Sequence, residues 1–128
     1  PTCQKVEELL EAFPDHTTVS LETNGFRVSE QMLKNEDFWY TLSPKEAYVL
    51  PEVLIRADEI KLLVGAEGFL HPSWASIISN PRITAWKYLM PVYDANYLCN
   101  VERAVYMIKL NPISCRLGIQ MHKHIDIP

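Results

Sequence analysis

Short apolar segments with the period of β-strands alternate along the chain with segments that have the period of helices. The strand-like segments are rich in branched and aromatic residues and cover residues 18–22, 37–43, 58–65, 82–90 and 115–124. The helix-like segments repeat an apolar residue every three or four positions and cover residues 1–13, 29–34, 43–57, 71–80 and 94–112. This alternation predicts one α/β unit over residues 1–128, with mostly parallel strands and right-handed helical crossovers. The pattern fits either a layered sheet or part of a barrel.

Local signals mark where several of these helices begin and end. A proline ends the first helix at position 14, another divides the 43–57 segment at position 51, and a third lies in the first turn of the 71–80 helix. Asp94 precedes the longest helix and is a candidate cap for its free backbone N–H groups. The inner, apolar stripe of that helix is predicted to consist of Tyr97, Val101, Ala104, Val105 and Ile108.

Several predicted strands end in polar side chains. These residues are Glu22 in the first strand, Ser43 and Lys45 after the second, and Gln120 and His122 in the last. In α/β sheets and barrels, ligands bind at the carboxyl ends of the strands. A carboxylate such as that of Glu22 is costly beside a packed layer unless something binds it. We therefore expect these side chains to face one rim and to form the wall of a pocket.

Two short polar segments, residues 43–46 and 24–25, also have purely structural interpretations. Residues 43–46, Ser-Pro-Lys-Glu, match a capping box with proline at the first helical position, and the local sequence favours this interpretation. A helix start with free N–H groups also attracts a carboxylate or a phosphate, so the two roles are compatible. Asn24-Gly25 is typical of a turn with positive φ, and Gly25 would also let a ligand approach the backbone closely.

The C-terminal segment contains a pattern that resembles a metal site. His122, His124 and Asp126 would share one face of an extended segment, as metal ligands do. No cysteine pattern accompanies them, and short patterns of this kind specify a site only loosely. We therefore assign no metal ligands in this chain.

The cysteines and tryptophans are interpreted first as packing residues. Cys3, Cys99 and Cys115 are widely spaced, so reduced thiols in a cytoplasmic protein are a simpler interpretation than disulfides. Cys99 and Cys115 are expected to be small core residues. Three further aromatic residues are also expected to pack, with an aromatic floor under a planar ring as the alternative: Trp74, Trp86 and Tyr88.

Composition narrows the possible classes of protein. Of 128 residues, 48% are hydrophobic and 22% are charged, which is typical of a globular domain with a sizeable core. The formal net charge of −4 argues against a protein that binds nucleic acid by neutralising phosphates. No segment approaches the roughly 20 apolar residues of a membrane helix, and nothing at the start resembles a signal peptide. We therefore expect neither a nucleic acid nor a membrane as a partner.

Four motifs occur in order along nearly the whole chain: LETNG at 21–25, TLSPK at 41–45, RADEIKLLVG at 56–65 and GIQMHKHIDIP at 118–128. In this order and spacing they resemble the C-terminal half of the 7-carboxy-7-deazaguanine synthases, a family of radical S-adenosylmethionine enzymes. The resemblance implies an incomplete (β/α) barrel, of which this chain would form a half with about five strands.

The resemblance also implies an activity. Such enzymes hold a 4Fe–4S cluster with three cysteines near the N-terminus, and the cluster binds S-adenosylmethionine. Reductive cleavage of this cofactor starts the ring contraction of 6-carboxy-5,6,7,8-tetrahydropterin to 7-carboxy-7-deazaguanine, a Mg²⁺-dependent step of queuosine and deazapurine biosynthesis. The cofactors carry the chemistry, and the protein orients and protects the reactants.

The residues of the implied site fall into two groups. Those expected to contact the pterin substrate are Glu22, His122 and, through its terminal carboxylate, Pro128. Those expected to bind S-adenosylmethionine are Asn24, Gly25, Ser43 and Lys45.

This sequence departs from the family at several positions. It has no C-x-x-x-C-x-x-C motif, no Gly-Gly-Glu motif and no Mg²⁺-binding segment. Met90 stands where the family has a glutamine before Pro91, and Met121 replaces the threonine of Gln-Thr-His-Lys. We therefore expect a truncated or split half that depends on an N-terminal segment or a partner chain for the cluster. The alternative is a non-catalytic half-barrel that binds a pterin, a nucleoside or a protein, and that forms homodimers through its unpaired edge.

Overall fold

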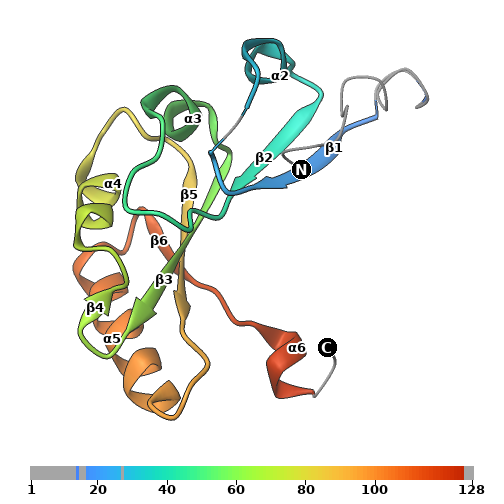
Figure 1. Ribbon diagram of the computed structural model, residues 1–128. Coiled ribbons are helices and arrows are strands. Elements are labelled where there is room, and N and C mark those ends of the chain that lie inside the picture. The colour runs from blue at the N-terminus through green and yellow to red at the C-terminus, as the bar shows by residue number, and fades with distance from the viewer. Residues whose placement is uncertain (1–13, 15–16, 27, 126–128) are drawn as a thin grey trace.

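The computed structural model describes residues 14, 17–26 and 28–125, and it has an α/β fold (Figure 1). Five parallel strands form the sheet in the order β1-β2-β3-β5-β6. The strands are β1 Val19–Thr23, β2 Phe38–Leu42, β3 Glu59–Gly65, β5 Trp86–Pro91 and β6 Cys115–Leu117. The predicted α/β fold with a parallel sheet is confirmed, and every predicted strand overlaps an observed one.

Helices connect the parallel strands along the chain, and one more helix follows the last strand. They are α2 Glu30–Lys34, α3 Pro51–Arg56, α4 Ala75–Ser79 after a 3₁₀ turn at Pro72–Trp74, α5 Tyr97–Leu110 and, after the last strand, α6 Met121–His124. The longest helix in the described part of the chain is α5, with 14 residues. None of the helices described there combines the length and the apolar character needed to cross a bilayer.

The helices that carry the main core lie on one face of the sheet. Strands that are consecutive in the parallel path are also neighbours in the sheet, so every crossover moves in the same direction. Right-handed crossovers that all move one way place their helices on one face. Figure 1 shows α3, α4 and α5 on the same side of β3 and β5. The main core lies in this layer and includes Leu42, Ile60, Leu62, Val64, Trp74, Leu89 and Ala104.

Arg56, the last residue of α3, attaches α2 to the rest of the fold. Its guanidinium donates hydrogen bonds to the backbone carbonyls of Leu33, Asn35 and Phe38, at 2.9 to 3.1 Å. The same group forms an ion pair with Asp58 at 3.0 Å. A helix of five residues is too short to be stable by itself, so these tertiary bonds hold α2 in place.

The predicted helix over residues 43–57 is only partly correct. The helix begins at Pro51, and residues 43–50 are not helical, so the capping-box interpretation of Ser43 is wrong. The backbone N–H of Ser43 instead donates to the carbonyl of Thr23 at 2.7 Å, which extends the pairing of β1 with β2. Backbone pairing with β1 therefore overrides the local sequence preference for a helix start at Ser43.

Two further elements differ from the predicted ones. The last strand ends at Leu117, and the chain then leaves the sheet and forms α6, where an extended segment was predicted through residue 124. A two-residue strand, β4 Gly68–Phe69, pairs with the end of β3 in antiparallel orientation. Gly68 has a φ of 120°, which other residues rarely adopt, and this glycine allows the tight turn. The predicted helix at 1–13 lies outside the described residues.

Helix α5 confirms its predicted stripe and corrects one cysteine. Ala104 is fully buried, and the other four stripe residues are half-buried. Cys115 is buried as expected, but Cys99 is exposed, so its predicted burial is wrong. Cys99 lies about 200° around the helix from Tyr97 and therefore faces away from the stripe. The N-cap of α5 is Asn96, with no side-chain cap hydrogen bond, so the predicted cap at Asp94 is wrong. Asp94 instead accepts the backbone N–H of Asn96 at 2.8 Å, just before the helix begins.

Candidate functional site

The face of the sheet opposite the main core, here called the open face, carries polar and aromatic side chains. Alternate residues of each strand point to it, and the strand register aligns Glu22 with Thr41 and Lys61 with Tyr88. By this register the open face consists of Ser20, Glu22, Trp39, Thr41, Glu59, Lys61, Leu63, Trp86, Tyr88, Met90 and Arg116. Most of these side chains are at least partly exposed, so this face is available to a ligand.

A cavity of about 410 Å³, here called the rim cavity, opens on this face. Its lining comes from β1, β3, β5 and the segments that follow β2 and β6: Glu22, Ser43, Lys45, Lys61, Leu63, Met90, Ile119, Gln120, Met121 and His122. Its size is within the range of about 300–1,000 Å³ that is typical of small-molecule sites. The polar residues that were predicted to meet at one rim therefore line a single cavity.

The rim cavity offers contacts to both anionic and hydrogen-bond-donating groups. Lys45 and Lys61 supply two cationic side chains, whereas Glu22 supplies the one carboxylate among the lining residues. The positive excess favours an anionic ligand, and the carboxylate can accept hydrogen bonds from N–H groups of the same ligand. Leu63 and Met90 add apolar surface for a ring.

Lys61 is a site residue that the polar strand-end pattern missed. Its Nζ donates a hydrogen bond to Oε2 of Glu22 at 3.0 Å. The two side chains are 30% and 58% exposed, so the ion pair adds about 1 kcal/mol or less to stability. Lys61 lies in the middle of a strand and far from Glu22 in sequence. Its alternation phase within Glu59–Gly65, which places it on the less buried face, is the signal that could have found it.

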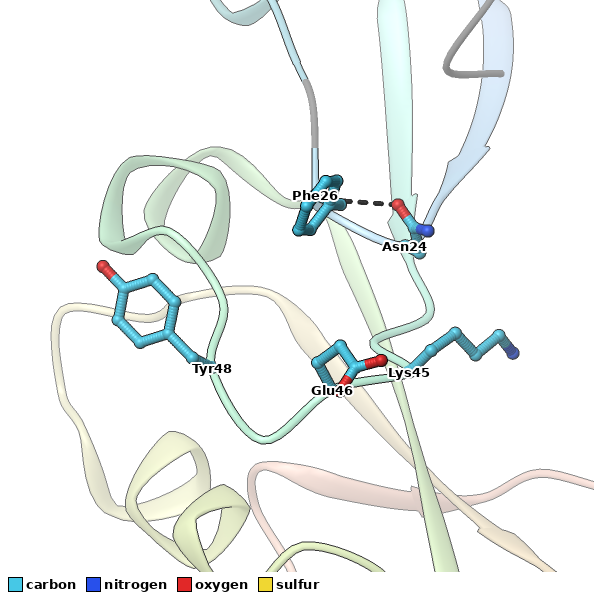
Figure 2. Close-up of a pocket in the computed structure, with 5 residues that line it drawn as sticks. All are labelled: Asn24, Phe26, Lys45, Glu46 and Tyr48. Carbon is cyan, nitrogen blue, oxygen red and sulfur yellow. Dashed lines mark hydrogen bonds between the residues drawn. The ribbon is translucent and has the colours of Figure 1, made fainter.

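Asn24 and Gly25, which were predicted to bind S-adenosylmethionine, differ in their surroundings. Asn24 lines a second cavity of about 450 Å³, next to the rim cavity, together with Phe26, Lys45, Glu46 and Tyr48 (Figure 2). Lys45 contributes to both cavities. The amide oxygen of Asn24 accepts the backbone N–H of Phe26 at 3.1 Å, so part of its side chain stabilises the turn.

Gly25 is buried and has a packing reason to be glycine. Its φ is 77°, and a Cβ at this position would lie 2.7 Å from Cδ1 of Leu42 and 3.0 Å from Cγ1 of Val49. Its backbone N–H donates to the hydroxyl of Thr23 at 3.2 Å. The predicted contact with a cofactor stays a prediction, as does that of Pro128, which lies outside the described residues.

Met90 lies in the rim cavity against the backbone of Gly118. A Cβ at position 118 would collide with the sulfur of Met90, so glycine there leaves room for the thioether. Gly118 also donates its N–H to the carbonyl of Leu89 at 3.0 Å, the last bond between this segment and β5. Residues 119–122 follow and also line the cavity.

An aromatic cluster attaches the C-terminal segment to the start of α5. The Tyr97 hydroxyl and Nε2 of His124 are 2.9 Å apart and share a hydrogen bond. The ring centroids of Tyr93, Tyr97 and His124 lie 4.9 to 5.2 Å from one another. His124 therefore faces α5, whereas His122 lines the rim cavity. Because residues 121–124 are helical, the predicted shared face of His122 and His124 is wrong.

The described residues do not fit an iron–sulfur cluster. They contain no group of three or more histidine, cysteine, aspartate or glutamate side chains that could hold a metal ion. Cys99 is exposed on α5 and Cys115 is buried beneath the helical layer on β6, so these two thiols do not form a common site. The donor set of the rim cavity suits an organic ligand with anionic and N–H groups instead.

Comparisons with known proteins assign this chain to no family. No family model matches this sequence, and a search of curated proteins finds no match.

Proposed function

We propose that this chain is the C-terminal, substrate-binding part of a 7-carboxy-7-deazaguanine synthase. In this proposal it binds 6-carboxy-5,6,7,8-tetrahydropterin and one end of S-adenosylmethionine. Residues outside this sequence, in a preceding segment or a separate chain, supply the 4Fe–4S cluster and the Mg²⁺ ligands. The cofactors then supply the radical chemistry, and this chain binds and orients the reactants.

The observation that carries the proposal is the convergence on the rim cavity. Glu22, Ser43, Lys45 and His122 belong to three different segments of the chain, and all four line the same cavity. The carboxylate of Glu22 can accept hydrogen bonds from the amino group and ring N–H of a pterin. Ser43 and Lys45 can bind the carboxylate end of S-adenosylmethionine, and Asn24 lies beside them.

The topology supports the half-barrel part of the proposal. In a doubly wound sheet the strand order reverses once, which places helices on both faces. Here the parallel strands follow one another without reversal, as they do around a (β/α) barrel. In a barrel, the open face would be the inner wall, which is where substrate and cofactor bind in the proposed enzyme.

The proposal is tested by reconstitution. The chain is co-expressed with the cluster-binding N-terminal half of a 7-carboxy-7-deazaguanine synthase and purified without oxygen, and product formation is measured with S-adenosylmethionine, Mg²⁺ and the pterin. We expect turnover, and we expect Glu22→Ala to lower it by about tenfold or more, because the buried edge of the pterin loses a charged acceptor. Tyr106→Phe, on the outer surface of α5, is the matched control and should retain full activity.

Two other outcomes have clear meanings. A complex that is shown to carry the cluster but forms no product would contradict the proposed enzyme. Retained pterin binding in such an inactive complex would favour the alternative, a non-catalytic binding module.

A further inference from the structure

Lys61 and Glu22 form an ion pair although their strands are not adjacent in the sheet. Glu22 is on β1 and Lys61 is on β3, with β2 between them. Strands lie about 4.8 Å apart, so the two backbones are separated by roughly 10 Å and both side chains must extend to meet. The position on β2 that aligns with Glu22 is Thr41, a short side chain that leaves room above the sheet. The 3.0 Å bond therefore defines one extended conformation for each partner.

The ion pair engages one side of the Glu22 carboxylate. Lys61 bonds to Oε2, and no other hydrogen bond to this carboxylate is found among residues 14, 17–26 and 28–125. The Glu22 side chain is 58% exposed, so the remaining lone pairs face the rim cavity and its solvent. A carboxylate has room for about four hydrogen bonds, so the pair with Lys61 does not exhaust it.

We propose that Lys61 is a positioning residue for substrate binding, which holds the Glu22 carboxylate in the orientation that accepts the amino and ring N–H groups of a pterin. This inference rests on the proposed function and deepens it. An exposed glutamate on its own samples several rotamers, and binding must then restrict them at a cost in affinity. The bond from Lys61 restricts the Glu22 side chain in the free protein, so less conformational entropy is lost when the ligand binds.

Lys45 provides an internal comparison because it brings the same charge to the same cavity. It is exposed and has no ion pair within the described part of the chain. A mutation at Lys45 therefore removes one positive charge from the cavity without releasing Glu22. If Lys61 acted only through its charge, its removal, like that of Lys45, would weaken pterin binding whether or not residue 22 is a carboxylate.

The test measures binding of 6-carboxypterin, a stable fluorescent analogue of the substrate, to the full chain of residues 1–128. We expect Lys61→Met to weaken binding by about three- to fivefold and Lys61→Arg to restore it to within about twofold of the wild type. Glu22→Gln should weaken binding by a similar factor, and adding Lys61→Met to it should cause no further loss. Lys45→Met removes a charge from the cavity and should weaken binding by the same factor in the wild-type and Glu22→Gln backgrounds, because it does not act through Glu22.

The outcomes separate the inference from the proposed function. Wild-type protein that does not bind 6-carboxypterin overturns the proposed substrate and this inference with it. Wild-type binding combined with an unaffected Lys61→Met variant overturns the inference alone. A full further loss from Lys61→Met in the Glu22→Gln background, like that expected for Lys45→Met, also overturns it, because the effect would then not pass through Glu22. Thermal unfolding of each variant identifies any loss that is due to misfolding.

Discussion

Lys87 is an ionisable residue on the packed face of the sheet. Its side chain is only 3% exposed, and its Nζ donates a hydrogen bond to the backbone carbonyl of Ile83 at 2.5 Å. On the next strand it is aligned with Cys115, which is also buried. Burial lowers the pKa of Lys87 from its ordinary value of 10.5, and the charge interaction with Cys115 acts in the opposite direction with a smaller effect.

The lowered pKa predicts that Lys87 makes the protein more stable as the pH rises. The folded protein binds the Lys87 proton less tightly than the unfolded chain does, because the pKa in the unfolded chain stays near 10.5. Because the unfolded state then binds more protons, the free energy of unfolding increases as the pH rises from the lowered pKa toward 10.5. Urea denaturation of the wild type and of Lys87→Met, between about pH 7 and about pH 10, measures this contribution.

Lys87→Met is a useful reference because it keeps the apolar stem and removes the titrating group. It also removes the bond to Ile83, but that loss is the same at every pH and shifts the difference by a constant. The stability of the wild type relative to Lys87→Met should therefore grow with pH. A difference that stays flat over the whole range would show that Lys87 titrates alike in the folded and unfolded states.

Sequence patterns identified individual site residues more reliably than their partners. A polar side chain at a strand end is visible in the sequence, so Glu22 and Ser43 could be named in advance. His122 was assigned to the end of the last strand but lies in α6. The ion pair of Glu22 with Lys61 depends on side-chain reach across an intervening strand, which no local pattern encodes. The burial of Gly25 against Leu42 and Val49 is likewise a tertiary fact, although the need for positive φ could be predicted.

The C-terminal segment depends on a small number of contacts for its position. Residues 121–124 form a single short helix, and all of them are exposed. A helix of this length has little stability of its own, so the contacts of His124 with Tyr93 and Tyr97 must hold it. Because the same segment brings Gln120 and His122 to the rim cavity, its attachment determines whether the cavity has a complete wall.

His124→Ala is expected to loosen this segment without unfolding the sheet. In this variant the backbone amides of residues 119–124 should exchange with deuterium about five- to thirtyfold faster, because the lost ring contacts and hydrogen bond contribute about 1–2 kcal/mol. Amides of β3 and β5 should be unchanged. His122→Ala is the matched control, since that side chain faces the cavity, and it should leave exchange over 119–124 nearly as in the wild type. Equal acceleration in both variants would contradict the anchoring role of His124.

Elements were predictable where hydrophobic periodicity and the tertiary fold agree. All five parallel strands were found, because each is a short apolar run that is buried on one face at least. The predicted capping box at Ser43 was wrong because the Ser43 backbone pairs with Thr23. The predicted extended C-terminal strand was wrong because hydrogen bonding to β5 ends at Gly118. Both outcomes depend on tertiary pairing in the sheet. Strand β4 has two residues, too few to leave a periodic pattern.

At the scale of the whole molecule, the sheet has one covered face and one open face. The alternation of strands and helices predicted parallel pairing, but it fits both doubly wound and barrel-like orders. The order without reversal, which the structure provides, is what leaves the open face exposed. Two tryptophans lie on it, Trp39 and Trp86, with 41% and 48% of their surface exposed. Trp86 keeps this exposure although the guanidinium of Arg116 lies 4.9 Å from its ring centroid.

Exposed tryptophans on an uncovered sheet predict that the isolated chain self-associates through the open face. Large aromatic surface in water is unfavourable, and burying it against a second copy recovers roughly 25 cal/mol per Å². Sedimentation velocity should therefore show larger species as the protein concentration rises. Trp86→Glu should shift the distribution toward monomer, because a carboxylate at this position would have to be desolvated in the dimer. Tyr106→Glu, a matched change at a ring that is 56% exposed on α5, should not shift it. A wild-type chain that remains monomeric at every concentration would mean that side chains such as Arg116 shield the open face sufficiently by themselves.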